Sequence, residues 1–150
     1  MKITTRLFGE IDIEEDKIIT FEDGIVGFPF LKRFTLIQDQ ESENNVIMWL
    51  QSMDEGVFAM PVMPPSIIIE DYAPTIHESS LEKLGNLTDD NTYSLVTVTV
   101  TDKIEEITAN LKAPIIINMD TLKASQLIVE DDYQVKHPLY DLLIQKKEEK

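Results

Sequence analysis

The sequence predicts a mainly β protein, a single-domain antiparallel β-barrel-like fold with two short helices. Most segments are short apolar or alternating runs bounded by turn residues, and only two segments have helical spacing. Of the 150 residues, 43% are hydrophobic, so one core can form without disulfides or metals. No internal repeat, low-complexity tract or linker divides the chain, and residues 1–150 are therefore assigned to one domain.

Strand patterns fill the first part of the chain. They are rich in β-branched and aromatic residues and cover residues 3–8, 10–13, 17–21 and 34–37. The first two runs join at Gly9, and an acidic turn at 14–16 precedes the third. Residues 38–45 are polar, which predicts a loop or a hairpin tip.

A hairpin is predicted in the middle of the chain. The apolar runs 46–52 and 57–60 flank residues 53–56 (MDEG), a short polar connection that ends in glycine. The prolines that follow at positions 61, 64 and 65 limit further pairing, because proline donates no N–H to a neighbouring strand. Residues 66–69 are predicted to resume as a short strand.

The second half contains the most regular strand pattern. Residues 93–101 alternate between two faces, as a strand with one buried face does. Residues 115–117 are all isoleucine and suit a fully buried strand. A turn at 118–121 leads to residues 124–129, which are predicted to pair with that strand as a hairpin.

Two helices are predicted. Ser79 and Glu82 match a capping box, in which a serine and a glutamate three residues later satisfy the first backbone donors, and Gly85 is placed to end this helix. The second helix is predicted at 138–147, because Pro138 suits the first helical position and three leucines follow at helical spacing.

The chain is strongly acidic, with 28 acidic and 13 basic side chains and a net charge of −15. Lys and Arg provide most of the affinity for a phosphate backbone, so direct binding to nucleic acid is not expected. The same argument disfavours an anionic membrane surface. The negative field instead favours a basic protein partner, whose approach it would accelerate.

The residue types predict no catalytic site, no metal site and no cofactor. Cysteine is absent, and the two histidines, His77 and His137, lie far apart in the sequence without clustered ligand spacing. The chain shows neither an apolar run of membrane-spanning length nor a leader pattern at its N-terminus, which predicts a cytoplasmic protein.

Paired carboxylates leave a second class of function open. Acidic pairs occur at positions 14–15, 70–71, 89–90, 105–106 and 130–131. Glycosidase-type chemistry needs two carboxyl groups that face each other across a cleft, one of them with a raised pKa. A small carboxylate-dependent hydrolase is therefore an alternative to the interpretation of these pairs as solvated turn residues.

A candidate binding segment is formed by Glu70, Asp71 and Tyr72, in a stretch broken by Pro74. Tyrosine is a common anchor of protein interfaces, and neighbouring acids can orient a basic partner. The alternative is a tyrosine that covers the core beside a solvated turn.

Several segments occur together in a specific order. They are residues 21–28 (FEDGIVGF), 49–52 (WLQS), 58–62 (FAMPV), 70–72 (EDY) and 110–118 (NLKAPIIIN). In order and spacing they resemble the bacterial flagellar assembly factor family, FliW, over residues 20–133. The DGIVGF and NLKAPI pieces together make the resemblance specific. Near Gln126 the family pattern has a Gly or Ala before the glutamine, and here only the glutamine matches.

The resemblance implies a compact, non-catalytic, β-barrel-like protein of the cytoplasm with two partners that exclude each other. One is newly made flagellin, bound near its C-terminal helical region, and the other is the RNA-binding translational repressor CsrA. Export of flagellin would free the factor to bind and antagonise CsrA, which couples flagellin export to flagellin synthesis. A binding barrel for another client is a further alternative.

Capture of a disordered, amphipathic flagellin segment should need an apolar groove. The candidate lining residues are Phe58, Met60, Met63 and Tyr72, with Glu70 and Asp71 beside them as candidate contacts to a basic partner. Core packing is the alternative role for each apolar member of this set.

Overall fold

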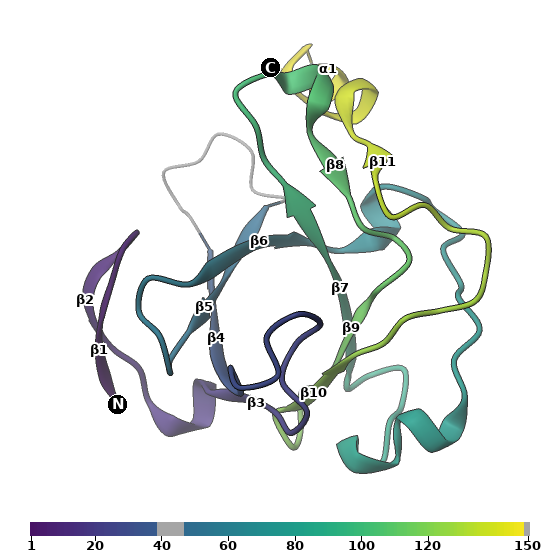
Figure 1. Ribbon diagram of the computed structural model, residues 1–150. Coiled ribbons are helices and arrows are strands. Elements are labelled where there is room, and N and C mark those ends of the chain that lie inside the picture. The colour runs from purple at the N-terminus through teal and green to yellow at the C-terminus, as the bar shows by residue number, and fades with distance from the viewer. Residues whose placement is uncertain (39–46, 149–150) are drawn as a thin grey trace.

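The computed structural model of the protein describes residues 1–38 and 47–148, with side chains described as far as Ile144. These residues form mainly strands, as the sequence predicts, and Figure 1 shows most of them wound into a ring. The loop predicted at 38–45 lies outside the described residues, apart from Gln38.

Seven strands of the described chain close into a barrel. In spatial order they are β7 (Thr92–Thr99), β6 (Ala59–Met63), β5 (Met48–Ser52), β4 (Arg33–Gln38), β3 (Ile19–Phe21), β10 (Lys123–Gln126) and β9 (Ile115–Asn118). Pairing of β9 with β7 completes the ring. Within this ring the pairs are antiparallel except β3–β10, which is parallel. The predicted mainly β barrel is confirmed, with this one departure from antiparallel pairing.

Both predicted hairpins are confirmed. In the β5–β6 hairpin Gln51 lies opposite Ala59, and in the β9–β10 hairpin Gln126 lies opposite Ile115. All four residues of β9 are buried, which agrees with a continuous apolar run rather than an alternating one. Local connections therefore set the register of both pairs.

Strand β7 carries the most regular alternation and serves three neighbours. Its first half pairs with β9, its middle with β6, and its end with β8 (Thr108–Ala109). Strand β11 (His137–Pro138) extends the sheet beyond β8 and leads into helix α1 (Tyr140–Glu148). Figure 1 shows β7, β8 and α1 rising as an arm above the ring. Strands β1 (Lys2–Thr5) and β2 (Gly9–Asp12) form a separate hairpin at the side of the barrel.

Two apolar clusters hold these parts together. The first fills the barrel, with buried residues Ile19, Phe21, Ile25, Leu31, Phe34, Leu50, Val62, Leu95, Ile115, Ile117 and Ala124. The second packs β6 and β7 against β8 and α1, with buried residues Met63, Val96, Val98, Ala109, Leu111, Leu139 and Leu143. Burial of such side chains is the main stabilising contribution, roughly 1.5–3 kcal/mol for each large residue.

The two predicted helices differ from expectation in detail. The C-terminal helix begins at Tyr140, because Pro138 is paired with Thr108 in the β11–β8 ladder. The predicted helix after Ser79 is instead two 3₁₀ turns, Glu78–Ser80 and Glu82–Leu84. Ser79 lies inside the first turn, so the predicted capping box is wrong. Gly85 does end the second turn, with a φ of 87° that favours glycine.

The strand predicted at 66–69 is also wrong. The chain forms a 3₁₀ turn at Pro65–Ile67, in which Pro65 supplies a φ suited to a helical start. The Ile68 N–H then donates to the Pro65 carbonyl at 2.9 Å, which closes the turn. No helix in the described part of the chain is long and apolar enough to cross a membrane.

Candidate partner-binding surface

Tyr72 is held in place by the turn that follows Pro65–Ile67. Its N–H donates to the Ile69 carbonyl at 3.1 Å, and its hydroxyl donates to the Leu111 carbonyl at 2.7 Å. The ring packs against Tyr133 with 4.6 Å between centroids. Burial raises the pKa of Tyr72 to about 12, and electrostatic interactions with the neighbouring Tyr133 and Asp131 act in the same direction. The hydroxyl therefore stays a neutral hydrogen-bond donor, fixed at its buried end.

Tyr72 lines an open groove of about 310 Å³. The groove residues are Pro64, Pro65, Ser66, Tyr72, Pro74, Ile76, Tyr93 and Ser94, and we call this surface the proline-tyrosine groove. Its volume is at the lower end of known binding pockets, and its walls are apolar with a few hydroxyl groups. The prolines restrict backbone freedom, so a partner that binds here meets a preformed surface.

Two carboxylates stand next to this groove. Glu70 and Asp71 are exposed on the turn that leads into Tyr72, so both are free to face a partner. The sequence-predicted trio of Glu70, Asp71 and Tyr72 thus combines an apolar depression with adjacent negative charge. Its contact with a partner stays a prediction.

Phe58 and Met63 are placed elsewhere. Phe58 is partly buried against the barrel core, where its ring lies 4.7 Å from that of Phe28 and 6.3 Å from that of Phe34. Met63 is completely buried in the second cluster, with 0% of its surface exposed. In this conformation Met63 packs the core below Tyr72 and has no surface to offer a partner. The five predicted residues therefore do not form one continuous site.

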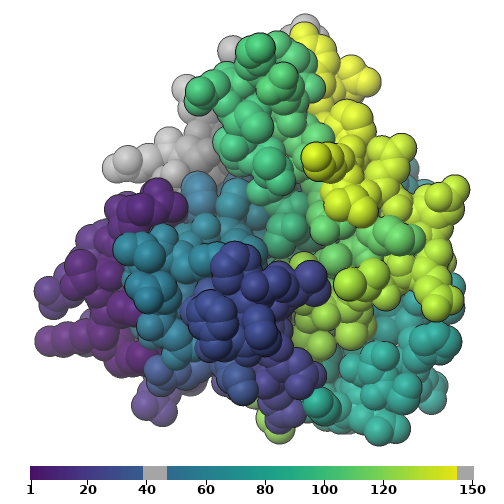
Figure 2. Space-filling model, in the orientation of Figure 1, coloured from purple at the N-terminus to yellow at the C-terminus, as the bar shows by residue number. Residues whose placement is uncertain are grey.

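An exposed aromatic loop was missed by the sequence reasoning, which used residues 21–28 only as part of the family resemblance. Gly24 has a φ of 69°, and a Cβ there would lie 2.6 Å from the Pro29 Cα, so the turn requires glycine. The turn exposes Val26 and Phe28, and Phe30 beyond it is 70% exposed. Figure 2 shows this dark blue segment projecting from the face of the barrel. The available signal was the pair of aromatic residues Phe28 and Phe30 on either side of Pro29, directly after a glycine-containing turn.

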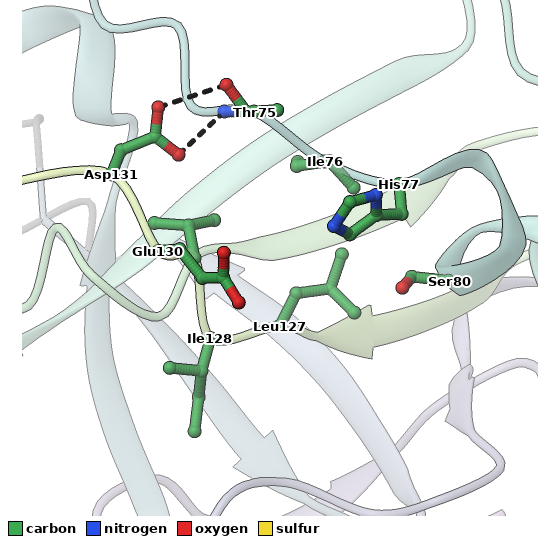
Figure 3. A pocket seen from close by; sticks show the side chains of 9 residues that line it. Thr75, Ile76, His77, Ser80, Leu127, Ile128, Glu130 and Asp131 are labelled. Carbon is green, nitrogen blue, oxygen red and sulfur yellow. Dashed lines mark hydrogen bonds between the residues drawn. The ribbon is translucent and has the colours of Figure 1, made fainter.

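A second, smaller depression of about 160 Å³ lies between residues 75–77 and 127–131 (Figure 3). At one end Asp131 joins the two walls, because its carboxylate accepts the Thr75 N–H at 2.9 Å and the Thr75 hydroxyl at 3.1 Å. The Thr75 N–H is the main reason that the pKa of Asp131 is lowered, and the Thr75 hydroxyl and Lys112 contribute further. Asp131 therefore acts as an ionised clamp.

Comparison with known proteins identifies the family of this chain. The sequence model of the FliW protein family matches residues 2–139, nearly the whole chain. The chain belongs to the FliW family.

Two flagellar assembly factors are similar to this chain over almost their full length. The flagellar assembly factor FliW of Lachnospira eligens is 48% identical over 152 aligned positions, which cover 99% of each chain. That of Lachnoclostridium phytofermentans is 46% identical, with 94% of this chain and 92% of the relative covered. A crystal structure of the flagellar assembly factor FliW superposes with a TM-score of 0.85 at 32% identity, covering 93% of this chain and 97% of the other.

The FliW sequence motifs meet in space through one side chain. The Gln126 amide oxygen accepts the Val26 N–H at 2.9 Å, and its amide nitrogen donates to the Ala113 carbonyl at 3.1 Å. Val26 belongs to the FEDGIVGF segment and Ala113 to the NLKAPIIIN segment. The matching glutamine thus joins the aromatic loop to the strand pair β9–β10.

Proposed function

We propose that this protein is a cytoplasmic flagellar assembly factor that binds flagellin and, when free of it, binds and antagonises the translational repressor CsrA. In this function it couples flagellin export to flagellin synthesis by exchange of partners and catalyses no reaction. The observation that carries the proposal is identity of 48% over the full length with a protein named flagellar assembly factor FliW.

The chemistry of the chain supports both partners. A repressor that binds mRNA needs basic surface, and a chain of net charge −15 attracts it. A flagellin segment that is amphipathic when helical needs an apolar surface. The proline-tyrosine groove supplies one next to Glu70 and Asp71, which supports the assignment of these residues as partner contacts.

The proposal is tested with purified proteins. The chain is immobilised, and flagellin and CsrA are applied separately and then in competition at modest salt. We expect each to bind alone and each to displace the other. Failure to bind either partner, or simultaneous binding of both without competition, contradicts the proposal.

The hydrolase alternative gains nothing from the geometry of Asp131. Its neighbour Glu130 precedes it on the same extended segment, so the two carboxyl groups do not come from opposite walls of the depression. Asp131 has a lowered pKa and both oxygens engaged by Thr75, which are the properties of a structural carboxylate and not of a general acid. Assay of glycosidic substrates with the pure protein tests this alternative directly.

A binding barrel for another client is separated from the proposed function by co-purification. The tagged chain is recovered from cells of its own source and the bound proteins are identified by mass. Flagellin and CsrA are the expected companions, and consistent recovery of a different protein in their place favours the alternative.

A further inference from the structure

The strand β10 continues, as a pairing edge, beyond its last residue Gln126. The Leu127 N–H donates to the Pro114 carbonyl and the Val129 N–H to the Lys112 carbonyl, each at 2.9 Å. Residues 127–129 are therefore extended and remain attached to the segment before β9. In such a segment successive N–H groups point to opposite edges. The Ile128 N–H and carbonyl must then face away from β9.

The neighbouring strand, β3, does not extend along this outer edge. Strand β3 pairs with β10 only at Lys123 and Ala124. Among the described residues, neither the Ile128 N–H nor the Glu130 N–H has a hydrogen-bond partner. The Ile128 side chain is 67% exposed. Residues 128–130 thus form a short, open strand edge, which is the kind of surface that accepts another strand.

The opposite wall of the smaller depression includes extended backbone. His77 has φ −72° and ψ 135°, and residues 75–77 run beside the open edge with the Asp131–Thr75 clamp at one end (Figure 3). The clamp fixes the two walls relative to each other, so the depression of about 160 Å³ is preformed.

We propose that the edge at residues 128–130 binds an extended, basic segment of a partner protein by strand addition. Main-chain hydrogen bonds to Ile128 and Glu130 would supply affinity, and alternate side chains would enter the depression or reach the acids around it. This site adjoins the proline-tyrosine groove, with which it shares Ile76 in its lining, and it does not depend on which protein the partner is.

Charge selects the occupant. The exposed side chains next to both walls include the carboxylates of Glu78, Glu130 and Asp132, beside the ionised Asp131. A second copy of this chain, itself at −15, would bring like charges together across a shared edge. A segment with Lys or Arg at alternate positions meets carboxylates instead, so the basic peptide is the favoured occupant.

The test uses a fluorescein-labelled hexapeptide of alternating Lys and Val, with an alternating Glu and Val peptide as its control. Anisotropy titration is carried out with the full chain and with two variants at one position. Ile128→Pro removes the exposed donor and leaves the Leu127 and Val129 hydrogen bonds in place, whereas Ile128→Thr keeps the donor. We expect Ile128→Pro to weaken binding of the Lys peptide about tenfold and Ile128→Thr to leave it unchanged.

Amide exchange in the unmodified chain gives a second readout that does not depend on how the proline variant folds. Bound Lys peptide should slow exchange of the Ile128 and Glu130 amides, because strand addition gives both a hydrogen bond. Three results overturn the proposal: no binding of the Lys peptide, equal binding of the Glu peptide, or protection confined to amides outside residues 126–131.

Discussion

Asp54 attaches the turn between β5 and β6 to the start of β4. One carboxylate oxygen accepts the backbone N–H groups of Lys32 and Arg33 at 2.9 Å each, and the other contacts the Arg33 guanidinium at 2.7–2.8 Å. Partial burial raises the pKa of Asp54, but the two backbone donors and the guanidinium outweigh it, so the pKa is lowered. A single side chain thus binds two backbone donors that would otherwise be unpaired at the barrel rim.

The Asp54→Asn variant should lose stability in a pH-dependent way. Because the folded-state pKa lies below the unfolded value of about 3.9, the carboxylate contributes fully above that pH and loses its contribution as pH falls through the folded value. We expect a loss of about 1 kcal/mol at pH 7, a modest figure because solvent screens this largely exposed group. Thermal melting at pH 7 and pH 3 checks the sign. The difference in melting temperature between the unmodified chain and Asp54→Asn should be smaller at pH 3.

Gly56 allows the β1–β2 hairpin to approach the barrel. Its carbonyl accepts the Arg6 N–H at 3.1 Å, and a Cβ at this position would overlap the carbonyl oxygen of Thr4. The constraint is a backbone approach, which only glycine permits.

In Gly56→Ala the hairpin should therefore be displaced while the barrel stays folded. We expect a loss of roughly 1–3 kcal/mol, together with faster amide exchange at Arg6. Glu55→Ala is the matched control, because Glu55 is the exposed neighbour in the same turn. Equal exchange rates at Arg6 in the two variants would show that the hairpin is held by other contacts.

At the scale of elements, Gln126 connects segments that the chain separates widely. It holds the aromatic loop through Val26 and the approach to β9 through Ala113, so two loops share one amide. Both contacts require an amide, because it carries an acceptor oxygen and a donor NH₂ group on the same carbon.

Gln126→Glu should break this match by placing an acceptor against the Ala113 carbonyl. We expect destabilisation of about 1 kcal/mol, because the Ala113 carbonyl, which is part-buried at this contact, loses its donor. The exposed Gln134→Glu change provides the same chemistry at the surface and should be nearly neutral. Urea denaturation of both variants measures the difference, and an equally small effect at Gln126 would remove its connecting role.

Sequence reasoning succeeded where contacts are local. The β5–β6 and β9–β10 hairpins follow from apolar runs on either side of a short turn. It failed where distant segments decide the outcome. The parallel β3–β10 pair is such a case and has no local signal. The error at residues 66–69 is instead local, because Pro65 starts a 3₁₀ turn that closes at Ile68.

The candidate site shows the same division. The adjacent Glu70, Asp71 and Tyr72 were found as one segment, and they do stand beside a groove. Tyr93 reaches that groove from β7, a pairing that no local pattern indicates. Met63 lies on the buried side of β6, and an apolar residue between prolines does not reveal which side it faces.

At the scale of the whole molecule, charge and shape act over different distances. The net charge of −15 produces a field that extends beyond the contact surface and accelerates approach of a basic partner. In the proposed complexes the proline-tyrosine groove would contribute only after contact, when apolar surface is buried. A change in one exposed acid should therefore alter the association rate more than the dissociation rate, if the acid lies near the interface.

Asp71→Lys tests this division on the proposed CsrA complex. We expect its association rate at low salt to fall by about 3- to 10-fold, with a smaller change in the dissociation rate. Glu10→Lys changes the net charge equally but lies on β2, on the opposite side of the barrel from the groove (Figure 1). At 0.1 M salt it should slow association much less than Asp71→Lys, because the potential of a single charge then falls off within about 10 Å. Stopped-flow measurements across a salt series compare the two, and equal slowing in both variants would place Asp71 outside the interface.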